Sequence, residues 1–121
     1  MLDDKKKPDH TRGLAFWDAD DNVTGWTAHL WNNVGAENVS EYAAPARTRS
    51  VEDLPRLYLE CPQLDILLQE NLEYVRRFGE ANISTEFHLY EGLTYGFAGL
   101  APTAVSIQRA RQNRIRAMTT F

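Results

Sequence analysis

Asp65 is the first residue whose type and position could support chemistry. Its carboxylate follows an apolar run at residues 57–61 and stands near the start of a helical pattern. A carboxylate at that point could orient an imidazole for proton transfer, or it could cap the following helix. The spacing alone favours the capping role, and the catalytic role stays open.

A second segment of interest is the sequence EGLTYGF at residues 91–97. Its two glycines, Gly92 and Gly96, can adopt backbone conformations that other residues avoid, so they allow a tight loop. Such a loop would expose a side chain between them, such as Tyr95. In a parallel sheet, reacting groups gather where strands end, and both Asp65 and this loop follow predicted strands.

Two strands and a helix must position these residues. Residues 57–61 are apolar enough for a buried strand, which Pro62 is expected to end because it has no amide for a continuing ladder. Residues 83–90 alternate β-branched or aromatic residues with polar ones, which predicts a second strand. A strand, a helix and a strand in this order predict a right-handed crossover with parallel strands, and therefore the α/β class.

The predicted helix between these strands follows from apolar residues at four-and-three spacing, from Leu64 to Phe78. Glu73 is placed to pair with Arg77 one turn later, and Gly79 is predicted to end the helix in a left-handed conformation.

The flanking segments are predicted from simpler patterns. A short amphipathic helix covers residues 23–31, with a cap among residues 20–22, and residues 32–55 read as an extended connection. Residues 102–121 form a closing helix. The apolar face of this helix consists of Ala104, Ile107, Ile115 and Met118. Its basic face, expected to be solvated, consists of Arg109, Arg111, Arg114 and Arg116. We expect residues 1–12 to be a flexible tail and residues 13–121 to form a single partial domain.

Composition limits the function further. The chain has 121 residues, 43% hydrophobic and 25% charged, which is typical of one soluble globular domain. Its net charge of -4 would repel a phosphate backbone, so nucleic acid is not an expected partner. One cysteine cannot form an internal disulfide, and no apolar run is long enough for a membrane span or a secretory leader. The sequence therefore predicts a cytoplasmic protein without a membrane segment.

The remaining reactive side chains are interpreted as structural. His10, His29 and His88 lie too far apart in the sequence for a metal-ligand pattern, so we expect neither a metal nor a cofactor. His10 and His29 are expected to be solvated, and His88 to belong to the second strand. Cys61 ends the first strand without an activating histidine, so we expect a buried, unreactive thiol.

Several motifs in a shared order give the chain a resemblance to a known family. Together they resemble the carboxyl-terminal part of α/β-hydrolases of the hormone-sensitive-lipase type, which hydrolyse carboxylic esters. The motifs are FWDADDN at 16–22, GW at 25–26, VSEYAAPAR at 39–47, LP at 54–55, LDIL at 64–67, Glu70 and TEFHLY at 85–90.

The resemblance implies a Ser, Asp and His triad, with the serine in a Gly-x-Ser-x-Gly elbow. Asp65 stands at the position of the family's acid, while Tyr95 stands where the histidine precedes Gly-Phe. The sequence has no Gly-x-Ser-x-Gly elbow and no His-Gly-Gly oxyanion segment. A tyrosine with an ordinary pKa of about 10 cannot accept a serine proton at neutral pH as an imidazole does.

The resemblance therefore leads to two hypotheses. In the first, the chain is a truncated, degenerate homologue of an ester hydrolase, with Asp65 and Tyr95 as vestigial triad positions. In the second, the site performs proton-transfer chemistry such as cyclisation, isomerisation or elimination, with Tyr95 as acid and Asp65 as base. A separate partner could supply the serine, but the combined site would still lack its histidine. Expected partners are a second copy or another protein, and a small hydrophobic ligand remains open.

Overall fold

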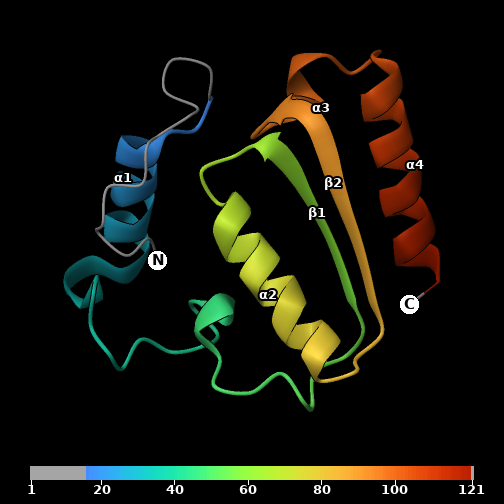
Figure 1. Cartoon of the computed structure of the whole chain (residues 1–121). Helices are drawn as coiled ribbons and strands as arrows, with labels where there is room; N and C mark the ends of the chain where they lie inside the picture. Colours follow the sequence, from blue (N-terminus) through green and yellow to red (C-terminus); the bar gives the residue numbers. More distant parts are fainter. Residues whose placement is uncertain (1–15, 121) are drawn as a thin grey trace.

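The computed structural model describes residues 16–120 as a two-stranded sheet with a helix on each face (Figure 1). The strands β1 (Leu57–Leu64) and β2 (Thr85–Thr94) are parallel and are joined by α2 (Leu68–Glu80). α3 (Phe97–Leu100) and α4 (Val105–Thr119) follow, and α4 lies against the face opposite α2. The predicted α/β class and the parallel crossover are confirmed. The predicted tail at residues 1–12 lies outside the described residues.

The strands pair residue by residue from Leu57 with Thr85 to Pro62 with Tyr90. The predicted end of the first strand at Pro62 is wrong, because β1 continues to Leu64 after an irregularity in register. β1 has one partner strand in the described sheet, so it is an edge strand. An edge strand leaves part of its amides outside the ladder, and a proline is tolerated there.

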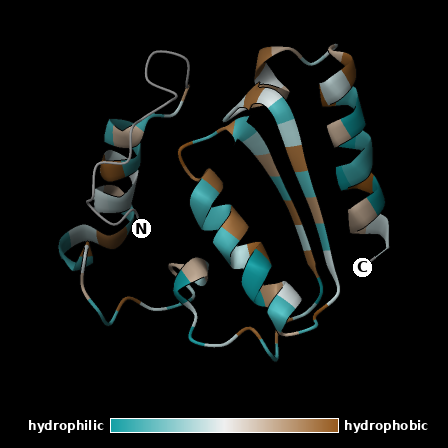
Figure 2. Ribbon diagram, viewed as in Figure 1, coloured by the Kyte–Doolittle hydropathy of each residue, from teal (hydrophilic) through white to brown (hydrophobic). Residues whose placement is uncertain are grey.

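Side chains of β2 alternate between the two faces of the sheet, as the sequence predicts. Figure 2 shows this alternation of hydrophobic and hydrophilic residues along the strand. Tyr90 is buried on the face that α4 covers, while Leu89 is 47% exposed on the other face. The described residues therefore bury only some of the apolar side chains of β2.

The structure corrects both ends of α2. The helix begins at Leu68 instead of Leu64, because residues 65–67 form a turn in which the amide of Leu68 donates to the Asp65 carbonyl. It then runs through Gly79 to Glu80, and the left-handed residue after it is Asn82, with φ of 55°. Asparagine adopts this conformation more readily than most residues.

The predicted pair of Glu73 with Arg77 is also replaced. Glu73 pairs instead with Arg76, which also contacts Glu80 on the exposed side of α2. The Arg77 guanidinium donates to the carbonyls of Ala46 and Thr48. This arginine therefore ties the long connection before β1 to the helix.

That connection follows α1 (Ala19–Leu30) and contains only two short 3-10 turns, Trp31–Asn33 and Pro45–Arg47, as its composition predicts. α1 starts earlier than expected, because Asp18 caps it instead of a residue among 20–22. The Asp18 carboxylate accepts hydrogen bonds from the amides of Asp20 and Asp21 at 2.8 and 3.0 Å, and the Asp21 carboxylate accepts one from the Asp18 amide at 3.2 Å. This reciprocal pair is a capping box.

The closing helix α4 buries only part of the predicted apolar face. Ile107, Ala110 and Ala117 are buried, whereas Ile115 and Met118 are 51% and 66% exposed. The two alanines, Ala110 and Ala117, are small and seven residues apart, so they let the helix approach the sheet closely. Ile107 and Ala110 pack with Tyr90 and Phe97 in one hydrophobic core cluster.

Two of the arginines of α4 also point to the sheet. Arg114 pairs with Glu60 on β1, and Arg116 pairs with Glu86 on β2. The side chains of Arg114 and Arg116 stay 42% and 51% exposed, so the predicted basic face is partly solvated, but these two residues also hold ion pairs with the sheet. The reason is that the carboxylates on this face of the sheet need partners, and the arginines supply them. No helix in residues 16–120 is long and apolar enough to cross a membrane.

We expect Ile107→Ala to lower the free energy of unfolding by about 2–4 kcal/mol, since it removes a buried aliphatic side chain from the core cluster. Urea denaturation followed by circular dichroism measures this change. Val105→Ala is the matched control on the same helix, because Val105 is 86% exposed. Equal losses for the two variants would contradict the described packing of α4.

Candidate functional site

Asp65 and Tyr95 line the same cavity, which has a volume of about 250 Å³. The cavity lies where β1 and β2 end, because Asp65 directly follows β1 and Tyr95 directly follows β2. Parallel pairing brings these two strand ends to one edge of the sheet. Other residues around the cavity include Glu60, Leu67, Asn71, Phe97 and Arg114.

Asp65 is held by the turn that starts α2. One carboxylate oxygen, Oδ1, accepts a hydrogen bond from the Leu67 amide at 2.8 Å. A bond from a side-chain oxygen to the amide two residues later defines an Asx turn. The favoured prediction that Asp65 caps the helix is therefore wrong, because α2 has no side-chain cap. Asp65 is only 8% exposed, and burial raises the pKa of its carboxyl above the ordinary value, although the Leu67 amide opposes that effect.

Tyr95 lies in a short turn after β2. The predicted loop at 91–97 is wrong for its first four residues, because β2 continues past residue 90 to Thr94, which pairs with Leu64. Gly92, inside the strand, and Gly96, in the turn, have φ of 68° and 73°. The Gly92 amide donates to Gln63 Oε1 at 3.0 Å, which links this part of β2 to the end of β1. The Tyr95 ring lies 5.7 Å from the Trp17 ring and is 39% exposed. No hydrogen bond joins Tyr95 to Asp65 among the described residues.

The remaining polar wall of the cavity was not singled out by the sequence analysis. Glu60 accepts hydrogen bonds from Arg114 and from the Tyr58 hydroxyl, the latter at 3.2 Å. The side-chain amide of Asn71 donates through Nδ2 to Cys61 Sγ at 3.2 Å. One signal was available for Arg114, because it follows Ala110 by four residues and therefore shares its face of α4.

The histidines and serines of the described chain lie away from this cavity. His88 contacts Glu86 Oε1 through Nε2 at 2.6 Å, and His29 Nε2 lies 3.1 Å from the Ala43 carbonyl. His10 lies outside the described residues. None of the four serines lines the cavity. The cavity thus combines the carboxylates of Asp65 and Glu60 and the phenol of Tyr95 with no imidazole and no serine hydroxyl from residues 16–120.

Cys61 is also near this site but is fully buried. Burial raises the pKa of its thiol, so the thiolate is disfavoured. This environment agrees with the predicted unreactive cysteine. Among residues 16–120, no group of three or more His, Cys, Asp or Glu side chains is placed to hold a metal ion.

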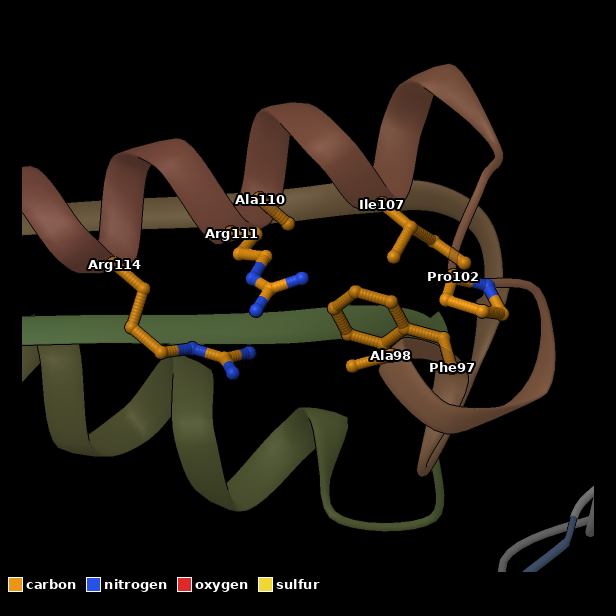
Figure 3. A pocket seen from close by; sticks show the side chains of 7 residues that line it. All are labelled: Phe97, Ala98, Pro102, Ile107, Ala110, Arg111 and Arg114. Carbon is orange, nitrogen blue, oxygen red and sulfur yellow. The ribbon is translucent and has the colours of Figure 1, made fainter.

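A second cavity of about 350 Å³ adjoins the first and shares Phe97, Ala98 and Arg114 with it. Figure 3 shows Arg111 and Arg114 extending from α4 into the space before β1. The other residues that line this cavity are apolar: Phe97, Ala98, Pro102, Ile107 and Ala110. This cavity has no carboxylate or phenol on its wall, so it offers less chemistry than the first.

Comparisons with known proteins agree with the resemblance seen in the sequence. A family model described as alpha/beta hydrolase fold matches residues 2–99. A bacterial heroin esterase structure superposes with a TM-score of 0.60 at 38% identity, covering 64% of this chain and 24% of the esterase. The esterase LipW from Mycobacterium marinum gives a TM-score of 0.73 at 26% identity, covering 91% of this chain and 34% of LipW. The chain thus spans about a third or less of either structure. No curated protein gives a significant match.

We expect Asp65→Asn to raise the free energy of unfolding at neutral pH, on the order of 1 kcal/mol. The raised pKa of Asp65 means that the native state binds this proton more tightly than the unfolded state, so ionisation at neutral pH costs stability. Asparagine removes the charge and keeps an oxygen for the Leu67 amide. Urea unfolding at a series of pH values measures the difference.

The gain from Asp65→Asn should shrink as the pH falls through the raised pKa of Asp65, and it should vanish below the ordinary aspartate pKa, where both states are protonated. Asp53→Asn, at an exposed acidic residue, is the control. A gain for Asp65→Asn that does not change with pH would refute this account.

Proposed function

Because this chain belongs to the alpha/beta hydrolase fold family, we propose that it is a noncatalytic homologue of a carboxylic-ester hydrolase. Its role is to associate with a second copy of itself or with another protein. In this proposal Asp65 is the retained acid of a degenerate triad, and Tyr95 stands at the position of its histidine.

One observation carries this proposal: the cavity that contains Asp65 and Tyr95 has no serine and no described histidine on its wall. Ester hydrolysis by this family needs a nucleophile, a base that accepts its proton and donors that stabilise the oxyanion. The described cavity supplies the acid alone. Tyr95 cannot replace the base, since an ordinary phenol does not take a proton from serine at neutral pH.

A second candidate is a proton-transfer enzyme that uses the same two residues. Asp65 and Tyr95 share one cavity, and burial raises the pKa of Asp65 toward the range that suits a general base. In that role the Asp65 carboxylate would accept a proton from the substrate, and the Tyr95 hydroxyl would donate one. Loss of the native reaction in both Asp65→Asn and Tyr95→Phe, with the fold intact, would favour this candidate.

Self-association is supported by the sheet. In the described chain it has two strands, and both of its edges are open. Open edges present unpaired amides and carbonyls to any neighbouring strand. Leu89 on β2 is 47% exposed, so pairing there would cover apolar surface as well. A two-fold axis beside β2 would join two small sheets into one of four strands.

We also propose that the protein works in the cytoplasm. Its single cysteine, Cys61, is buried without a disulfide, which fits a reducing compartment.

The purified chain is expected not to hydrolyse short-chain p-nitrophenyl esters above the rate in buffer. Tyr95→His alone should not create activity, because no serine lines the cavity. Release of p-nitrophenolate measures both rates. Hydrolysis that survives repurification and is lost in Asp65→Asn would overturn the noncatalytic proposal.

Sedimentation at micromolar concentration should report a dimer or a larger species. Leu89→Lys should shift it to monomers, because it places a charge in the proposed β2 interface. Val34→Lys is the matched control, since Val34 is 42% exposed in the connection after α1. A folded monomer of the unmodified chain at that concentration would contradict self-association through β2.

A further inference from the structure

The Asp65 carboxylate has one oxygen that the described protein does not use. Oδ1 accepts from the Leu67 amide, whereas Oδ2 has no hydrogen-bond partner among residues 16–120. Asp65 is 8% exposed and lines the 250 Å³ cavity. No buried side-chain oxygen of residues 16–120 lacks a hydrogen-bond partner, so Oδ2 is not sealed inside the protein. Because Asp65 lines the cavity, this accessible oxygen can accept a hydrogen bond from a donor that enters it.

The charges around the cavity indicate which ligand would fit. Two other charged side chains line it, Glu60 and Arg114, and they pair with each other. The Tyr58 hydroxyl also donates to Glu60. These groups are therefore satisfied within the protein. The uncompensated charge is that of Asp65, so the cavity favours a cation.

Apart from these charged groups and Asn71, the residues that line the cavity are mostly apolar or aromatic. Phe97 is buried, and Tyr95, Pro62 and Leu67 line the cavity with it. Aromatic faces attract cations and also pack against flat rings. The volume of about 250 Å³ lies just below the usual range of small-molecule pockets, which begins at about 300 Å³, so a ligand with a single ring is the upper limit.

We propose that this cavity binds a small organic ammonium ion with a flat apolar body, whose N–H donates to Oδ2 of Asp65. The inference rests on the proposed function in one respect, namely that no imidazole of residues 16–120 occupies the cavity. The neighbouring cavity has the opposite charge, because it is lined by the positive Arg111, which has no partner among the described residues. An anionic ligand would therefore not compete at Asp65.

Benzylammonium is the probe for this site, and the backbone amide of Leu67 is the reporter. That amide donates to Asp65 Oδ1 at 2.8 Å, so its ¹H–¹⁵N signal should shift when a cation engages the same carboxylate. We expect a saturable shift at millimolar benzylammonium. Asp65→Asn should weaken binding tenfold or more, because a charge-assisted hydrogen bond is lost. Asp53→Asn, at an exposed acidic residue, should leave binding unchanged.

A series of probes on the unmodified chain tests the proposal without any substitution. Benzyl alcohol has the ring without the charge, and benzyltrimethylammonium has the charge without an N–H. Both should bind at least several-fold more weakly than benzylammonium. Binding of benzyl alcohol as tight as that of benzylammonium, unchanged binding in Asp65→Asn, or no shift of the Leu67 signal would each overturn the proposal.

The outcome is separable from that of the ester assay. A chain that hydrolyses p-nitrophenyl esters and also binds benzylammonium through Asp65 would overturn the noncatalytic proposal and retain the cation site. A chain that does neither would retain the noncatalytic proposal and overturn the cation site.

Discussion

The parallel pairing of β1 with β2 is the constraint on which the rest of this structure depends. It aligns Pro62 with Tyr90 and brings the carboxyl ends of both strands to one edge of the sheet. Asp65 and Tyr95 are thirty positions apart in the sequence, yet they line one cavity because each follows one of these strands. An antiparallel pair would have put them at opposite edges.

The face of the sheet under α4 explains why that helix lies as it does. Glu60 and Glu86 point to this face, and their carboxylates would be costly to cover without partners. Arg114 and Arg116 meet them, so the helix combines small buried residues with two ion pairs. The pair of Glu60 with Arg114 also neutralises the wall of the cavity. Packing of the helix and electrostatics of the site are therefore linked through one contact.

The cavity brings the Asp65 carboxylate and Tyr95 to one place without a hydrogen bond between them. Asp65 is still buried and still anchored by the Leu67 amide. The resemblance to the family implies that Asp65 stands at the acid that orients a histidine and that Tyr95 stands at the position of this histidine. In the structure Tyr95 makes no hydrogen bond to Asp65. The free carboxylate oxygen is the physical link between the noncatalytic proposal and the proposed ammonium site. Both proposals start from this carboxylate and from a cavity wall that has no imidazole from residues 16–120.

The sequence by itself determined the α/β class, the crossover unit and the family, because these follow from local periodicity and from short motifs. It also placed Asp65 and Tyr95 at neighbouring strand ends, where the structure has them line one cavity. It also indicated the turn at Tyr95, because glycines such as Gly92 and Gly96 can adopt a positive φ that other residues avoid. The exact limits of the helices were less predictable. Asp18 and Asn82 act at helix ends through side-chain and backbone geometry that several neighbouring residues could equally have supplied.

The tertiary structure alone decided which face of α4 is buried, which carboxylates pair with its arginines and which oxygen of Asp65 stays free. Arg114 looks like a solvated residue in a helical pattern, and only the approach of β1 brings Glu60 within reach of it. Contacts between segments more than fifty residues apart depend on packing, which leaves no periodic signal in the chain. The same reason hid Asn71 and Phe97, which line the cavity from two different helices.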